Sequence, residues 1–150
     1  MDLILWRHAE AHDSSPDMAR ELTPKGKKQA EKVAAFLHRH LSPDARVLVS
    51  PATRTRQTAD AYTDHYTLAP GIAPGASAHA VLQAAHWPNA EDAVLIVGHQ
   101  PTLGAVAALL LGSTEPSLSF KKGALWWFSR RERDEFAQTT LRLVITPDLL

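Results

Sequence analysis

The chain begins with an apolar run, Leu3 to Trp6, that ends abruptly in Arg7-His8. A run of strand-forming side chains predicts a buried β-strand over residues 2–6. In open α/β sheets, ligands bind in the crevice outside the carboxyl ends of the strands. A guanidinium and an imidazole delivered at that position indicate chemistry more than packing. We therefore interpret His8 as a nucleophile and Arg7 as the residue that holds the group His8 attacks.

Strand-like and helix-like patterns alternate over the first two-thirds of the chain. Predicted strands follow at 46–50 and 92–98, and predicted helices at 24–41, 51–66, 79–85 and 101–111. Residues 12–22 and the Pro- and Gly-rich residues 67–78 are predicted loops. Two more strands, 124–129 and 139–145, are joined by a charged turn, residues 130–135, as a hairpin. The pattern predicts one α/β domain over residues 1–150, a three-layer α/β/α sandwich with a mostly parallel central sheet.

Composition excludes several classes of function. The 16 basic and 16 acidic residues balance, so no global field attracts nucleic acid or an anionic membrane. The absence of cysteine excludes thiol chemistry and thiolate metal sites. The longest apolar run, residues 105–111, is far shorter than a membrane span, and the first residues enter a strand without a signal-peptide pattern. We therefore expect a cytoplasmic enzyme or binding domain.

Chemistry-bearing residues follow three of the predicted strands. The first strand ends in Arg7-His8, the second leads into Arg54, and the third ends at His99. If these strands are parallel neighbours, two arginines and two histidines face one crevice. Arginine matches phosphate oxygens in bidentate geometry, and the N-termini of the helices that follow also favour phosphate. An imidazole among them can attack phosphorus, so the set predicts phosphoryl transfer.

Four ordered motifs strengthen this interpretation: RHAE, LTPKGKKQA, SPATRTRQTA and VGHQP. Together they resemble the histidine phosphatase superfamily, which has a phosphoglycerate mutase-like fold, and in particular its small phosphohistidine phosphatases of the SixA type. The resemblance implies that His8 is transiently phosphorylated, and that Arg7, Arg54 and His99 bind the phosphoryl oxygens without a metal or other cofactor. The remaining expected substrate contacts are Arg20, Glu10 and Gln100. For the Glu10 side chain other roles remain open: it either orients a site histidine or faces solvent.

The sequence departs from the larger members of this family in one respect. They place a carboxylate after the second arginine as proton donor to an alkoxide leaving group, whereas residues 65–90 contain no Asp or Glu. An alkoxide, whose conjugate acid has a pKa of about 16, needs a general acid worth roughly 10²–10⁴ in rate. Protonated phosphohistidine instead expels a neutral imidazole, whose conjugate acid has a pKa of about 6.5. The gap therefore favours a phosphoramidate substrate, although His79 or a water is an alternative donor.

These observations predict a phosphatase that acts on a phosphorylated protein or a small phosphorylated substrate and releases inorganic phosphate. One alternative is hydrolysis of a small phosphate ester or nucleotide on the same fold. Another is a non-catalytic module that recognises phosphate or phosphohistidine. A metal site is not expected, because no HxH or HExxH spacing occurs and the arginines would repel a cation.

Overall fold

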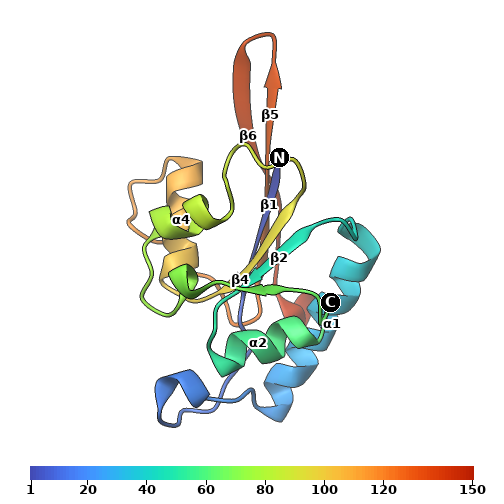
Figure 1. The fold of residues 1–150 in the computed structure, drawn as a ribbon, viewed down its shortest axis with the longest axis vertical. Helices are drawn as coiled ribbons and strands as arrows, with labels where there is room; N and C mark the ends of the chain where they lie inside the picture. The colour runs from blue at the N-terminus through green and yellow to red at the C-terminus, as the bar shows by residue number, and fades with distance from the viewer.

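A six-stranded sheet forms the middle layer of the computed structural model, which describes residues 1–150 (Figure 1). The strands lie in the order β3-β2-β4-β1-β5-β6. Their bounds are β1 Asp2–Arg7, β2 Arg46–Val49, β3 Thr67–Leu68, β4 Val94–Gly98, β5 Leu125–Arg133 and β6 Phe136–Ile145. The first four in this order are parallel, while β5 is antiparallel to β1 and β6 is antiparallel to β5. The predicted mostly parallel sheet is confirmed.

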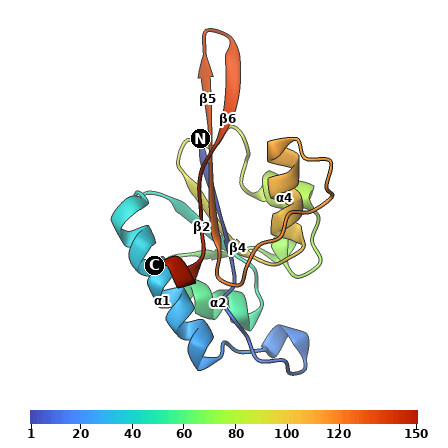
Figure 2. The same cartoon turned by 180° about the vertical axis from the view of Figure 1, so that it is seen from behind.

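Helices cover both faces of this sheet (Figures 1 and 2). They are α1 Pro24–His40, α2 Thr53–Asp60, α3 Ala78–Ala84 and α4 Thr102–Leu111, with short 3₁₀ helices η1 Asp17–Ala19, η2 Pro70–Ile72 and η3 Pro147–Leu149. Alternate residues of β1 enter opposite cores: Ile4 packs with the α1 side and Leu5 with the α4 side. The three-layer α/β/α sandwich is therefore confirmed. None of the four α-helices has the length and apolar character needed to cross a membrane.

The start of α1 is fixed to the segment that follows β1. Thr23 caps the helix, because its Oγ1 accepts a hydrogen bond from the Gly26 amide at 3.0 Å and donates one to Glu10 Oε2 at 2.8 Å. A Cβ at Gly26 would lie 2.0 Å from the Glu10 carbonyl oxygen. The absence of a side chain at Gly26 thus lets the first turn of α1 rest on the main chain two residues beyond His8.

Two predictions about the middle of the chain were wrong. Helix α2 ends at Asp60 and does not reach residue 66, and the predicted loop 67–78 contains β3 and η2. The cause is non-local. β3 pairs with the open edge of β2, and the Ala69 amide donates to the Val49 carbonyl oxygen at 2.8 Å. The composition of the segment alone does not reveal this pairing.

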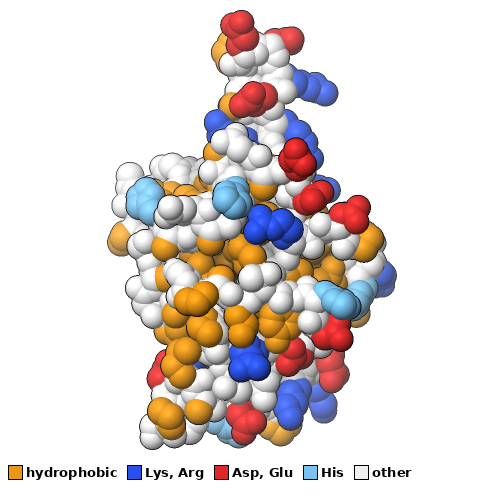
Figure 3. Space-filling model, in the orientation of Figure 1, with side chains coloured by type: hydrophobic (Ala, Val, Ile, Leu, Met, Phe, Trp, Pro, Cys, Tyr) orange, Lys and Arg blue, Asp and Glu red, His pale blue; other side chains and the backbone are white.

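The hairpin is also longer than predicted. β5 continues to Arg133, β6 begins at Phe136, and only Asp134 and Glu135 form the turn, with φ of 47° and 73°. Since β1 begins at Asp2, opposite Ser129, residues 130–133 pair with β6 alone. This part projects beyond the body of the protein and carries charged side chains, which a strand with no core beside it can accommodate (Figures 1 and 3).

Candidate active site

His8 lies immediately after β1, with its main chain held by two neighbouring segments. Its amide donates to the Gly98 carbonyl oxygen at 3.1 Å, and its carbonyl oxygen accepts from the Gly123 amide at 3.0 Å. The residue is 7% exposed, and its Nδ1 lies 2.7 Å from the Ala9 carbonyl oxygen. Because a carbonyl oxygen can only accept, Nδ1 carries the proton in this contact. Nε2 therefore keeps its lone pair, as a nucleophile requires.

Arg54, in the first turn of α2, lies directly against that nitrogen. Its Nε lies 3.3 Å from His8 Nε2, while Nη1 donates to the Asp17 carbonyl oxygen at 2.8 Å and Nη2 lies 3.2 Å from Asp17 Oδ2. Thr58, one turn further along α2, donates to the Arg54 carbonyl oxygen and accepts from the Ala9 amide at 3.1 Å. Thr58 thereby fixes the helix that carries Arg54 to the segment that carries His8.

His99 completes this group from the end of β4. Its ring centroid lies 5.4 Å from that of His8, with the planes inclined by 56°. Its Nε2 lies 2.7 Å from the hydroxyl of the buried Ser50, and its Nδ1 is buried without a partner in the protein. When Ser50 donates its hydroxyl proton to Nε2, Nδ1–H is left to donate to an oxygen that enters the site.

Both imidazoles are uncharged at neutral pH. Burial lowers the pKa of His8 to about 4, and the positive charges of Arg54, Arg7 and Arg20 act in the same direction. Burial also lowers the pKa of His99 to about 3, with further lowering from His8 and Arg54. Positive charge in the site thus comes from arginine, and the His8 lone pair is available without deprotonation.

Arg7 is the last residue of β1, and its side chain contacts the loop that precedes β5. Its Nη1 donates to the Phe120 carbonyl oxygen at 2.7 Å, and its Nε is buried without a partner in the protein. Burial lowers the pKa of Arg7, but an arginine remains charged at physiological pH. Arg7 therefore presents a fixed positive charge with spare donor capacity.

Arg20 is linked to Arg54 through Asp17. Its Nε donates to the His12 carbonyl oxygen at 2.7 Å, and its Nη1 lies 3.3 Å from Asp17 Oδ1. Since Asp17 also holds Arg54, the loop before α1 links the two guanidinium groups. Sequence reasoning missed Asp17. The available signal was an acidic residue three positions before Arg20 in a loop expected to cover the strand end.

The other two expected substrate contacts make their side-chain hydrogen bonds within the protein. The Glu10 carboxylate accepts from Thr23 at the start of α1. The Gln100 amide uses both ends, with Nε2 donating to the Leu118 carbonyl oxygen at 2.9 Å and Oε1 accepting from the Gly104 amide at 2.7 Å. These hydrogen bonds connect Glu10 to the start of α1 and Gln100 to the start of α4. Their role as substrate contacts stays a prediction. The structure contains no grouping of three or more His, Cys, Asp or Glu side chains that could hold a metal.

Comparisons with known proteins show the family of the chain. Residues 3–77 match the model of the histidine phosphatase superfamily (branch 1). A SixA phosphohistidine phosphatase homologue of Haemophilus influenzae is 33% identical over 132 residues, covering 77% of this chain and 80% of that protein. A Picosynechococcus protein is 36% identical over 136 residues, covering 83% and 82%.

A solved structure extends the likeness to the whole fold. The protein histidine phosphatase SixA complexed with tungstate superposes with a TM-score of 0.78 at 27% identity, covering 99% of both chains. The predicted phosphoglycerate mutase-like fold is confirmed. The family model covers half of the chain, and curated relatives exceed 30% identity over more than two-thirds of it. The chain belongs to the histidine phosphatase superfamily.

Proposed function

We propose that this phosphatase removes the phosphoryl group from phosphohistidine in a protein, through a covalent intermediate on His8. One observation carries the proposal. Nδ1 of His8 is tied to the Ala9 carbonyl oxygen, and Nε2 lies 3.3 Å from Nε of Arg54. The ring is thus oriented, uncharged and placed beside a fixed cation that can hold the group under attack.

In the first step, the Nε2 lone pair of His8 attacks phosphorus and forms an N–P bond. The P–N bond of the substrate breaks, and its electron pair returns to the departing imidazole. Arg7, Arg54 and the Nδ1–H of His99 neutralise the phosphoryl oxygens during transfer. The Ala9 carbonyl oxygen stabilises the positive charge that His8 acquires, because it accepts a hydrogen bond from Nδ1–H.

In the second step, water attacks the phosphorylated His8. An O–P bond forms, the Nε2–P bond breaks, and the electron pair returns to Nε2. The water proton leaves to solvent, and inorganic phosphate is released. His8 regains the uncharged state that its low pKa favours.

The choice of phosphohistidine as substrate is supported by the acids near the site. Residues 65–90 contain no carboxylate, and the carboxylate beside Arg54 belongs to Asp17. The charges of Arg54 and Arg20 outweigh slight desolvation and lower the pKa of Asp17, so this group stays ionised and cannot donate a proton. A substrate whose leaving group is a neutral imidazole needs no such donor.

The proposal is tested by rapid quench with a ³²P-labelled phosphohistidine peptide, beside a panel of small phosphate esters and nucleotides. We expect faster turnover of the peptide, and an acid-labile, base-stable label on the wild-type protein and on the surface control His65→Ala. His8→Ala should carry no label.

Two results would contradict the proposal. Preferential hydrolysis of a small ester would assign the protein to the small-substrate alternative. Phosphate binding without label or turnover would identify a recognition module.

A further inference from the structure

A cavity of about 610 Å³ lies beside Arg7, outside the group formed by His8, Arg54 and His99. Its walls come from the start of α1, the loop of residues 119–122 and the chain around η3, which lies beside α1 (Figure 2). We propose that this Arg7 cavity binds carboxylate side chains of an acidic protein segment next to the phosphohistidine. The inference rests on the proposed function and deepens it, because it specifies which phosphorylated proteins the enzyme prefers.

The charge of the cavity carries the first part of the argument. Lys25, Lys121 and Lys122 line it together with Arg7, against one acidic residue, Asp148. The three lysines are exposed and form no ion pair within the protein, whose salt bridges all involve arginine or histidine. In a chain with no net charge, this local excess of free cations indicates an anionic partner.

The connection to the nucleophile carries the second part. The loop that supplies Lys121 and Lys122 also supplies the Phe120 carbonyl oxygen that accepts from Arg7, and the Gly123 amide that donates to the His8 carbonyl oxygen. Arg7 is therefore a wall shared by the cavity and the phosphoryl site. An extended chain advances about 3.3–3.6 Å per residue, so side chains a few positions from a bound phosphohistidine can reach the lysines.

The lining indicates a protein segment as the occupant. Pockets for small molecules are mostly apolar, with a few placed polar groups, whereas this cavity is lined almost entirely by polar and charged residues. Nucleic acid binding requires a basic stripe that follows a phosphate backbone, and three lysines around one hollow do not provide it. Carboxylates on a flexible peptide match lysines, which act as mobile point charges.

The inference is tested with two phosphohistidine peptides that differ only in flanking residues, Glu in one and Ala in the other. We expect kcat/KM to be about threefold to tenfold higher for the Glu peptide, the range that two or three exposed ion pairs produce. The preference should weaken as ionic strength rises, and it should fall sharply in Lys121→Gln/Lys122→Gln, which keeps only Lys25 of the three lysines. The matched control is Lys27→Gln/Lys32→Gln, which removes the same charge from exposed positions of α1 outside the cavity.

Hydrolysis of p-nitrophenyl phosphate, measured in parallel, distinguishes a failure of the Arg7 cavity assignment from a failure of the proposed function. Equal turnover of both peptides, or an equal loss of preference in both double variants, would overturn the Arg7 cavity while leaving phosphohistidine as the substrate. Turnover of the small ester with no turnover of either peptide would overturn the proposed function, and the cavity assignment with it.

Discussion

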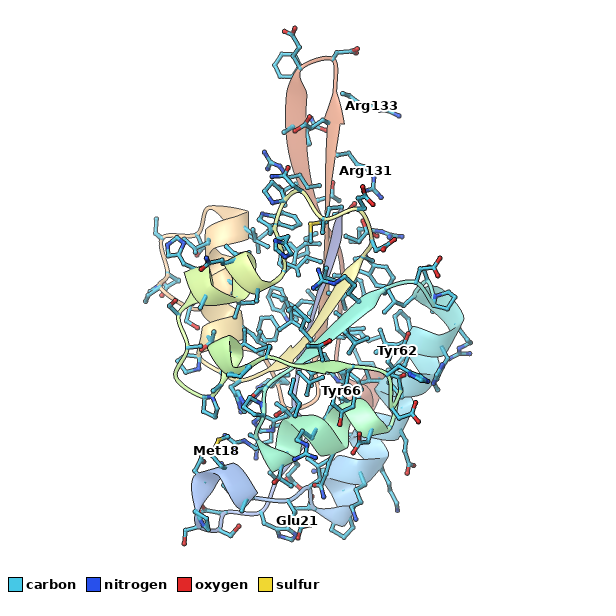
Figure 4. All side chains as sticks on the ribbon, viewed as in Figure 1. Met18, Glu21, Tyr62, Tyr66, Arg131 and Arg133 are labelled. Carbon is cyan, nitrogen blue, oxygen red and sulfur yellow. The ribbon has the colours of Figure 1, made fainter.

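The two ends of the central sheet differ in how deeply their side chains are buried. At the carboxyl end of the parallel strands, residues 3–6 of β1 and all of β4 are buried between helices. At the other end, β5 and β6 extend past β1 as a hairpin with most side chains in solvent. Figure 4 shows this separation, with Met18 and Glu21 at the end near the strand termini and Arg131 and Arg133 on the hairpin.

The contrast teaches where the molecule can hold a reactive group. The main chain of His8 is hydrogen-bonded on both sides, and Arg54 is held by Asp17 and Thr58. Groups fixed in this way need little reorganisation during reaction. The hairpin offers no comparable support, so chemistry should depend on the buried end and be indifferent to the projecting one.

Removing the His8 side chain is the strongest test of that contrast. We expect His8→Ala to have no detectable turnover of a phosphohistidine peptide, because no other ring nitrogen is placed against Arg54. The measurement is steady-state release of inorganic phosphate. Near-normal turnover in His8→Ala, with His65→Ala as reference, would remove His8 from its assigned role.

Removing the adjacent cation should have the next largest effect. We expect Arg54→Ala to lower kcat by about 10²–10³, the loss typical of one oxyanion donor. Arg56→Ala, an exposed arginine on the same helix, provides the matched control and should stay within twofold of the wild type. Equal losses in the two variants would show that general charge, and not the placement of Arg54, matters.

The protonation state of His8 provides a further test of the buried end of the sheet. By ring NMR we expect His8 to stay uncharged until the pH falls to about 4, while the urea-unfolded chain titrates near 6.5. Because the folded pKa of both site histidines is lowered, the unfolded state binds protons first. Their contribution to stability is complete above about pH 6.5 and is lost progressively as the pH falls toward the folded pKa, about 4 for His8 and about 3 for His99.

Urea unfolding between pH 4 and 7 measures that loss. A free energy of unfolding that is independent of pH over this window would contradict the buried, uncharged state of both rings.

Crowding the contact between α1 and the main chain of Glu10 should have a smaller effect. In Gly26→Ala the new methyl group meets the Glu10 carbonyl oxygen, and we expect a loss of about 1–3 kcal/mol in the free energy of unfolding. Gly71→Ala is the control, since a Cβ there meets nothing within 4 Å. Urea unfolding of both variants checks the prediction, and equal stability would show that α1 does not rest on this carbonyl.

The hairpin should give the smallest effect. Phe136 begins β6 beside the turn and is 74% exposed. We expect Phe136→Ser to change the free energy of unfolding by less than about 0.5 kcal/mol and to leave kcat/KM unchanged. A marked loss of activity would show that the projecting end takes part in the reaction, and would remove the contrast between the two ends.

The sequence predicts the buried end of the protein much better than the rest. β1, β2, β4 and α1 carry strong local signals, namely apolar runs and the Thr23-Pro24 start. The motifs with His8, Arg54 and His99 come directly after β1, β2 and β4. β3 depends on pairing with the distant strand β2, so its local composition is uninformative. Residues 130–133 pair locally with β6, but their charged side chains resemble a turn. Ser50, Thr58 and Asp17 were missed for a related reason, because each acts through a hydrogen bond across the fold.

The Asp17 carboxylate on Arg54 has a consequence for selectivity. Before any substrate arrives, this guanidinium already has a negative partner, so an incoming group must displace an internal competitor. A monoanion gains little binding energy when it replaces the Asp17 carboxylate on Arg54, whereas a doubly charged phosphoryl group gains more. The Asp17 carboxylate would therefore reduce the occupation of the Arg54 site by singly charged anions in solution.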